Sequence, residues 1–212
     1  MSQNRLPPPE SQACLFRLRP STQKGGTLIA EEVTDHATHE KRICDPNGYR
    51  LPFCPRCKQT RLHVHDYRER VLRAEPGPPV TRTVRLLGVF CEAIWQVLPL
   101  FLARHLWRSW KVVRHTLMPD AQTSSPSEPP HWPKVPERTV RRWRQRWLRP
   151  AHTLGQILAA SGQAVWATLA TGLPVDATCA DLVRAYAREH VGPPLAGLAA
   201  LLYRLQPKVR LM

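Results

Sequence analysis

Residues 51–99 decide the fold: Cys54-Pro-Arg-Cys57 is followed by Arg61-Leu-His-Val-His-Asp-Tyr67 and then by the run from Val80 to Phe90. Apolar and polar residues alternate in the middle stretch, which is the period of a half-buried strand. The later run is rich in Val, Thr and Leu and predicts a second strand. Between them, Pro76-Gly-Pro-Pro79 predicts a loop. Residues 51–99 therefore predict a small β unit.

A helical period replaces this alternation after residue 99. Ser109 is a suitable N-cap for a helix on which Trp110, Val113 and Leu117 share one face. A further helix is predicted over Glu137–Arg149, because its acidic first turn suits the helix dipole and a proline follows its last residue. Helices therefore follow the β unit along the chain.

The remaining segments complete the division of the chain. Residues 1–50 show little periodicity and predict a mostly irregular segment with room for a short strand or two. Residues 120–136 contain five prolines and predict a linker within a helical region that spans 100–150. Residues 151–212 are rich in Ala and Leu and predict a helical segment, with helices at about 154–170, 180–190 and 195–205. Strands followed by helices predict an α+β fold.

The chain has 212 residues and a formal net charge of +15, from 31 Lys and Arg against 16 Asp and Glu. This charge favours a polyanionic partner, nucleic acid before an anionic membrane surface. No stretch resembles a secretory signal peptide, and residues 154–173 are too polar to span a membrane. We therefore expect a cytoplasmic protein without membrane association, in which paired cysteines act as metal ligands more often than as disulfides.

Cys54 and Cys57 form a C-x-x-C pair, which can bring two thiolates to one zinc ion. Cys91 lies where a zinc ribbon places its other pair, but Ile94 occupies the second position of that pair. Structural zinc takes four ligands, so the first two alternatives are zinc with a fourth ligand from elsewhere, and a ribbon without zinc that packs Ile94 and Trp95 in its core. The third is a redox C-x-x-C, which the lack of a surrounding βαβ pattern disfavours. The candidates for the fourth ligand are His63, His65 and Cys44.

The predicted helix at 137–149 concentrates positive charge. Val140, Trp143 and Trp147 form an apolar stripe, and arginines cover the rest. Guanidinium groups bind phosphates and guanine edges, so this helix favours a nucleic-acid partner. A solvated basic helix, a membrane-surface helix and an RNA-binding helix are the alternatives. The residues expected at the interface are Arg138, Thr139, Arg141, Arg142, Arg144, Gln145, Arg146 and Arg149, helped upstream by Arg104, Arg108, Lys111 and Arg114.

In combination, Cys54-Pro-Arg-Cys57, the predicted strands ending at Cys91, and Leu98-Pro99 resemble the N-terminal zinc ribbon of bacterial insertion-sequence transposases. Ser109–Leu117 and Arg138–Trp143 resemble the helix-turn-helix that follows that ribbon. The resemblance covers about half of the chain and implies recognition of double-stranded DNA. The implied zinc ligands are Cys54, Cys57 and Cys91, and the implied recognition helix covers 138–149.

The chain departs from that family in two places. Ile94 stands at the fourth ribbon cysteine, and the proline-rich residues 120–136 stand where the family has its middle helix. Transposase chemistry also needs three carboxylates on two metal ions. After Glu137 the acidic residues are Asp176, Asp181 and Glu189, in a segment that predicts helices.

We therefore expect a bacterial DNA-binding protein, related to the recognition module of transposases, that is not an enzyme. The alternatives are a decayed or truncated transposase fragment with no activity, and the DNA-recognition subunit of a split transposase with a separate catalytic chain. The short apolar stripes of residues 151–212 must pack on each other, on the upstream region or on a second copy. From them we expect a small helical bundle that mediates homodimer formation.

Overall fold

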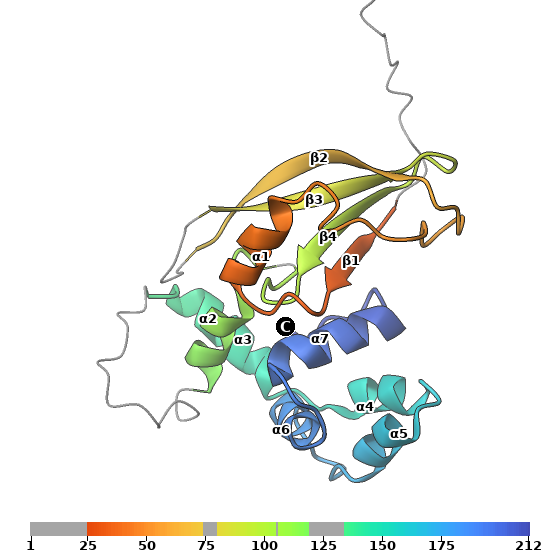
Figure 1. The fold of residues 1–212 in the computed structure, drawn as a ribbon. Helices are drawn as coiled ribbons and strands as arrows, with labels where there is room; N and C mark the ends of the chain where they lie inside the picture. Colours follow the sequence, from red (N-terminus) through yellow and green to blue (C-terminus); the bar gives the residue numbers. More distant parts are fainter. Residues whose placement is uncertain (1–24, 74–79, 105, 119–133) are drawn as a thin grey trace, which may run out of the picture.

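The structure is a computed structural model that describes residues 25–73, 80–104, 106–118 and 134–212. It has the predicted α+β fold, with one four-stranded sheet and helices that mostly follow it (Figure 1). The strands are β1 (Thr27–Ala30), β2 (Leu62–Val71), β3 (Val80–Gly88) and β4 (Ile94–Pro99). The helices in the described residues are α1 (His36–Ile43), α2 (Trp110–Leu117), α3 (Glu137–Trp147), α4 (His152–Ala159), α5 (Ala164–Thr171), α6 (Cys179–Glu189) and α7 (Pro194–Leu205).

The sheet has the strand order β1-β4-β3-β2. β2, β3 and β4 are antiparallel neighbours, whereas β1 pairs in parallel with β4, so that Thr27 lies opposite Gln96. The predicted strands at 61–67 and 80–90 correspond to β2 and β3. A shift of register between Val64 and Asp66 marks a bulge in β2, a device that bends an edge strand.

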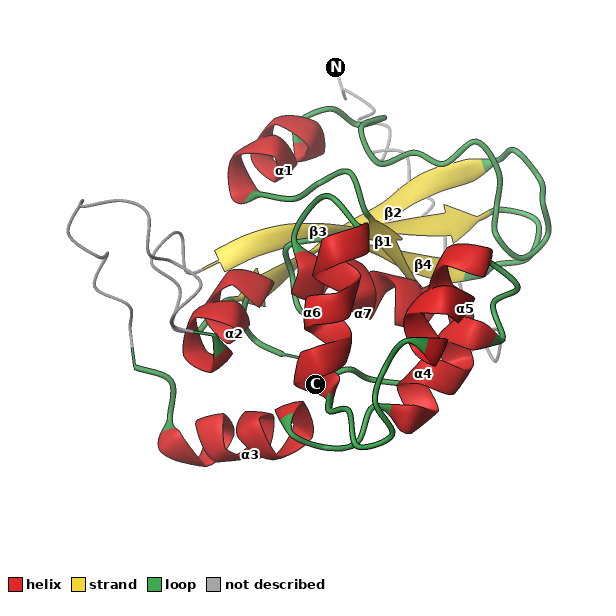
Figure 2. Ribbon diagram, turned by 90° about the horizontal axis from the view of Figure 1, so that it is seen from below, coloured by secondary structure: helices red, strands yellow, loops and turns green. Residues whose placement is uncertain are grey.

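Both faces of the sheet are covered near β1. Leu28 and Ala30 join a core cluster with residues of β3, β4 and α1, while Ile29 packs on the opposite face against a cluster that includes Leu100 and Ala196 of α7. This is the alternation that a strand with two buried faces requires. Figures 1 and 2 show α1 apart from the other helices, which lie on the same side of the sheet as α7.

Within residues 25–50, the structure contains one short strand, as the prediction of a mostly irregular segment allows, and one helix, α1, that the prediction did not include. β1 is only four residues long and acquires its hydrogen bonds from β4, so its own sequence carries little signal. α1 did leave a signal: Asp35 is its N-cap, and the Asp35 carboxylate accepts a hydrogen bond of 2.8 Å from the Thr38 backbone N–H. Residues 1–24 lie outside the described residues.

In the helical half, α2 and α3 begin where they were predicted, and α6 and α7 match the helices predicted at 180–190 and 195–205. The single helix predicted at 154–170 is wrong, because α4 and α5 are separate. Gly162 between them has φ +73°, a left-handed conformation that ends a helix. The predicted linker lies outside the described residues as far as residue 133.

The helices share one apolar core. Trp143 and Trp147 of α3 pack with Val113 of α2 and with buried residues of α4 to α7 such as Leu158 and Leu198. Residues 151–212 therefore pack on each other and on the upstream helices, two of the three possibilities that the sequence left open. Because this burial is achieved within one chain, the short stripes no longer require a second copy, and homodimer formation stays a prediction.

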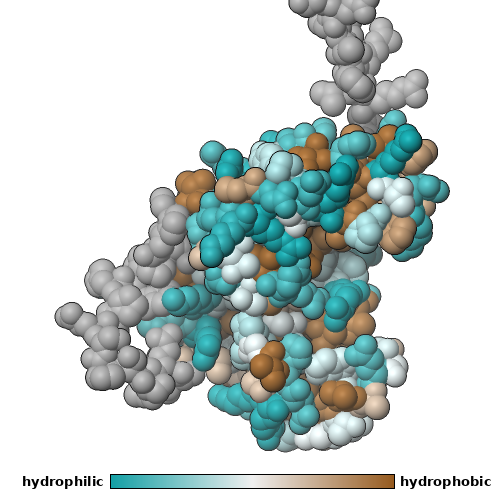
Figure 3. Space-filling view, viewed as in Figure 1, coloured by the Kyte–Doolittle hydropathy of each residue, from teal (hydrophilic) through white to brown (hydrophobic). Residues whose placement is uncertain are grey.

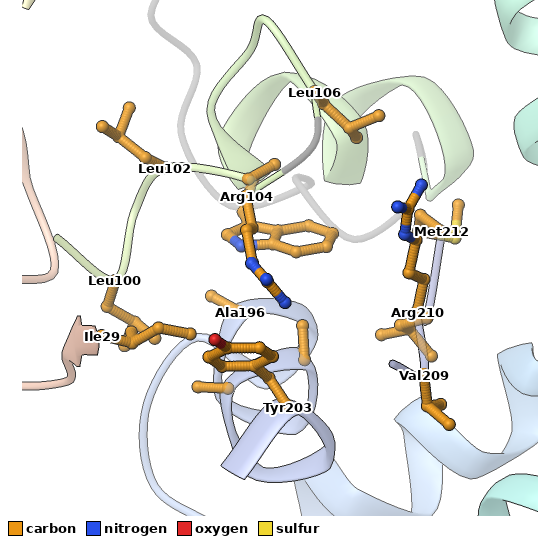
Figure 4. A pocket seen from close by; sticks show the side chains of 15 residues that line it. Ile29, Leu100, Leu102, Arg104, Leu106, Ala196, Tyr203, Val209, Arg210 and Met212 are labelled. Carbon is orange, nitrogen blue, oxygen red and sulfur yellow. The ribbon is translucent and has the colours of Figure 1, made fainter. Parts of the chain in front are cut away.

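The two halves meet along a narrow crevice between the sheet and α7 (Figure 4). The Arg104 guanidinium lies 3.8 Å from the centroid of the Tyr203 ring, and the Tyr203 hydroxyl donates a 3.0 Å hydrogen bond to the Thr27 carbonyl. The crevice has a cavity volume of only about 40 Å³, which suits a few water molecules. It is a packing seam rather than a ligand site.

The lengths of the helices also bear on membranes. None of the described helices is both long and apolar enough to cross a bilayer. The longest, α7, has 12 residues, against the roughly 20 that a span needs.

Candidate metal centre and nucleic-acid interface

Two turns bring three cysteines together. Cys54 and Cys57 lie in the loop before β2, where Lys58 has φ 60° and donates its backbone N–H to the Cys54 carbonyl. Cys91 lies in the turn between β3 and β4. The three Sγ atoms lie within 4.8 Å of one another. The sequence thus predicted a convergence that the fold produces from residues 37 positions apart.

The cluster has the dimensions of a thiolate metal site. The Sγ atoms of Cys54 and Cys91 are 3.6 Å apart, and two sulfurs bound tetrahedrally to zinc at about 2.3 Å would be about 3.8 Å apart. Gly88 leaves room for them, because a Cβ at this position would lie 3.0 Å from the Cys54 sulfur and 3.1 Å from the Cys91 sulfur. The residues present therefore fit zinc or another thiophilic metal.

The three thiols are not equivalent. Burial raises the pKa of the Cys54 thiol, but the backbone N–H groups of Cys57 and Arg56, with the neighbouring thiols, donate hydrogen bonds to its sulfur and lower the pKa to about 7. Burial raises the pKa of the Cys91 thiol, and the nearby Cys54 sulfur raises it further. Of Cys54 and Cys91, Cys54 is therefore the thiol that ionises first, and the thiolate is the form that binds metal.

The proposed sources of a fourth ligand do not reach this cluster. His63 and His65 are exposed on β2, and Cys44 is exposed at the end of α1. Within the described ranges, the cluster of possible metal ligands contains three cysteines and no fourth residue. Ile94 is half-buried in β4 opposite Leu87, and Trp95 packs against the sheet core. The structure thus has one feature of each alternative. The three thiols converge as a zinc site requires, and Trp95 packs in the core as a ribbon without zinc predicts.

α3 lies at the edge of the molecule (Figure 2), and most of its arginines are exposed. Trp143 is 2% exposed and Trp147 is 6% exposed, and these two rings fix the inner face of the helix. Thr139 and Val140 are half-buried. The exposed residues predicted for the interface are Arg138, Arg141, Arg142, Arg144, Gln145, Arg146 and Arg149.

The charge of α3 is not balanced locally. In the part of the chain that the structure describes, five of its arginines form no ion pair and no side-chain hydrogen bond, although six ion pairs occur elsewhere. These five are Arg138, Arg141, Arg142, Arg144 and Arg146. Their guanidinium groups are available to an external anion.

Other predicted interface residues have structural roles. Arg108 is only 8% exposed, and its guanidinium carbon lies 5.4 Å from the centroid of the Trp143 ring. It supports α3 from inside and does not reach solvent as a phosphate contact must. Arg149 donates a 2.6 Å hydrogen bond to the Arg210 carbonyl and so ties the end of α3 to the C-terminal segment. Lys111 is exposed on α2.

His39, which no sequence motif singles out, lies where α1 packs against the sheet and is 1% exposed. Its Nε2–H donates a 2.7 Å hydrogen bond to the Arg82 carbonyl, so its Nδ1 accepts the 2.6 Å hydrogen bond from the Tyr49 hydroxyl. Burial lowers the pKa of His39, and burial raises the pKa of Tyr49 to about 12. This neutral pair fastens α1 to β3.

Comparison with known proteins identifies no relative. No protein-family model, curated protein or solved structure matches the chain. The function must therefore be inferred from the chain's own residues.

Proposed function

We propose that the protein binds double-stranded DNA through α3 and has no catalytic activity of its own. The observation that carries this proposal is the row of exposed arginines on α3 without a carboxylate partner in the described residues. A row of unpaired guanidinium groups on one helix is suited to the phosphates that flank the major groove, and to guanine edges within it.

The packing of α3 supports this role. The helix has 11 residues and so is about 16 Å long, enough to enter a major groove about 12 Å wide. Its inner face is fixed by two buried tryptophans and by Arg108, so the arginines project from a rigid support. A preorganised helix loses less conformational entropy when it binds than a flexible basic segment does.

The proposal includes one zinc ion held by Cys54, Cys57 and Cys91. Zinc would join the loop before β2 to the turn between β3 and β4, and its chemistry here would be structural. The fourth coordination position would be filled by a ligand from outside the three cysteines. By the resemblance to transposases, a separate chain would supply the carboxylates for any DNA cleavage.

The test is a salt titration of duplex binding with Arg141, Arg142 and Arg146 replaced by Ala. DNA affinity should fall, and the slope of log affinity against log salt should become shallower by about 0.9 for each phosphate that the variant no longer neutralises. The matched control replaces Arg184, Arg188 and Arg204, which are exposed on α6 and α7, by Ala.

The control removes the same charge and therefore reproduces any long-range effect of net charge. It should retain the parent's slope. Equal decreases in affinity for the two triple variants would show that only net charge attracts DNA. An α3 variant that binds as the parent does would place the interface elsewhere.

A further inference from the structure

A polar groove lies on the face of the sheet opposite α1, beside Arg104, Leu106 and Trp107. Its volume is about 340 Å³, within the range of about 300–1,000 Å³ that is usual for small-molecule sites. It is lined by Arg68, Glu69, Arg70, Thr83, Gln96, Arg104, Leu106 and Trp107. None of these except Arg104 was expected at a binding surface from the sequence.

Positive charge is in excess in this groove. Arg70 donates hydrogen bonds to backbone carbonyls, at 2.5 Å to Ala103 and also to Leu106, and Arg104 donates to the Pro207 carbonyl at 3.2 Å. Neither forms an ion pair with a carboxylate of the described residues. Burial lowers the pKa of both guanidinium groups, as expected for cations that have lost water without gaining a counter-ion.

The third cation, Arg68, is more loosely held. Its side chain is 61% exposed, and its Nε lies 3.3 Å from a carboxylate oxygen of Asp66. That carboxylate is already engaged by both donors of Arg85. Glu69 adds one negative charge to the lining. With three guanidinium groups against one lining carboxylate, the groove favours an anionic ligand.

An aromatic ring stands at the groove. Trp107 is 57% exposed, although its backbone is fixed, because its carbonyl accepts a 2.6 Å hydrogen bond from the Arg73 N–H. The groove also contains Thr83, whose hydroxyl accepts a 3.3 Å hydrogen bond from the Gln96 amide. An exposed indole beside guanidinium groups is the combination that binds a nucleobase and its phosphate.

The groove adjoins the proposed DNA-binding helix. Arg108 follows Trp107 in the chain, and its guanidinium group lies over Trp143 of α3. Figure 3 shows the side of the molecule that carries α1, where hydrophilic residues predominate and apolar residues are scattered. Leu106 of the groove also packs against the core cluster that contains Trp143, so the groove and α3 are neighbours in the fold through Leu106 and Arg108.

We propose that this groove binds an unpaired DNA nucleotide next to the duplex held by α3, with the base stacked on Trp107 and the phosphate on Arg68 and Arg104. This inference rests on the proposed function. It assigns to the protein a substrate class narrower than duplex DNA, namely a junction between paired and unpaired DNA. Stacking on an aromatic ring tolerates every base, so the groove recognises the junction rather than a sequence.

The test compares three DNAs: a blunt duplex, the same duplex with an unpaired tail, and that duplex with a tail of abasic nucleotides. The parent protein should bind the tailed duplex about tenfold more tightly than the blunt one, since stacking of one base supplies an effect of this size. The abasic tail should lose most of the preference, because it retains phosphates but has no base to stack.

Trp107→Leu should abolish the preference for the tail and leave blunt-duplex binding within about twofold, while Trp107→Phe should retain most of it. The control is Tyr67→Leu, which removes an exposed ring of β2 on the opposite face of the sheet and should retain the parent's preference. Because Trp107 is exposed, these variants should fold as the parent does, which thermal unfolding checks.

The outcomes separate the two proposals. If the parent protein binds blunt and tailed duplexes equally, the proposed role of the groove is overturned but the proposed role of α3 is not. A Trp107→Leu variant that keeps the preference for the tail overturns the groove as well. A stronger preference for an RNA tail of the same sequence overturns the assignment to DNA. A parent protein that binds none of these DNAs overturns both proposals.

Discussion

The two halves of the molecule differ in what stabilises them. The helical half encloses an apolar core that includes Trp143, Trp147 and several leucines. The sheet half has a smaller core, in which a buried histidine and three cysteines accompany the apolar residues. A small core contributes little stability by burial alone. We therefore predict that the sheet half depends on cross-links, namely the His39 hydrogen bonds and the proposed metal on the thiols.

The halves also differ in how they use arginine. In the sheet half, Arg85 pairs with Asp66 and Arg42 pairs with Glu32, so these charges are largely neutralised. On α3 the arginines have no such partners among the described residues. Arg85 and Arg42 therefore contribute to the fold through these ion pairs, whereas the arginines of α3 remain available for binding.

The largest effect should follow removal of the metal. The purified protein should carry about one zinc per chain, and Cys54→Ser, Cys57→Ser or a strong chelator should unfold the sheet half, because binding energy is folding energy in such sites. The helical half should remain folded on its own core. Metal analysis and hydrogen exchange, read separately for the two halves, measure this.

Cys44→Ser is the control, since Cys44 is exposed and outside the cluster. It should change neither the metal content nor the stability. Metal-free protein with the parent's thermal transition would refute the zinc site, and simultaneous unfolding of both halves would remove the contrast between them.

Two glycine substitutions should change the free energy of unfolding in opposite directions. Gly88→Ala should destabilise the sheet half by about 1–3 kcal/mol, because its Cβ would crowd the Cys54 and Cys91 sulfurs. Gly155→Ala should stabilise the helical half by about 0.5–1 kcal/mol, because in α4 its Cβ would meet only the Ala170 Cβ, at 3.9 Å. Thermal unfolding of the two variants measures both; equal signs would contradict the assigned environments.

The smallest effect should come from mild acid. His39 has its folded-state pKa below the unfolded value of 6.5, because burial disfavours its charged form, so the unfolded chain binds the proton more readily. Its contribution to stability is therefore complete above pH 6.5 and is lost as the pH falls from there through the folded-state pKa. The groups that face it are Tyr49, the Arg82 carbonyl, His36 and Glu40.

The measurement is the stability of the sheet half between about pH 7.5 and about pH 5. This interval runs from roughly one pH unit above the unfolded-state pKa of histidine to roughly one and a half units below it. The parent should lose stability over this interval. A His39→Gln variant, which keeps one donor and one acceptor, should lose less. Identical slopes for the two proteins would assign the acid sensitivity to other groups, such as the thiols.

Local patterns predicted most of the regular structure. Ser109 caps α2 through a 3.4 Å hydrogen bond from the Val112 N–H, and the stripe of Trp143 and Trp147 is the buried face of α3. Such signals need only neighbours in sequence. β1 could not be predicted in this way, since its partner β4 is about 70 residues away. The break at Gly162 lies within an Ala-rich stretch whose composition favours one continuous helix.

For the candidate site, too, some features could be predicted from the sequence and others could not. The sequence indicated the candidate residues for the proposed function, namely the three cysteines and the arginines of one helix, because residue type and spacing determine which atoms can bind a metal and where charge gathers. It could not show that Arg108 is buried under α3, that Gly88 makes room for the sulfurs, or that Arg68 and Trp107 share a groove.

The sequence by itself determined the fold class, the helical and strand periods, the excess of positive charge and which three cysteines lie together. These follow from composition and from contacts between near neighbours. Only the tertiary structure decided which cations are used up internally and which face outward. That outcome depends on burial and on partners that are distant in sequence, such as Arg70 with Leu106 or Arg149 with Arg210, and no local pattern encodes them.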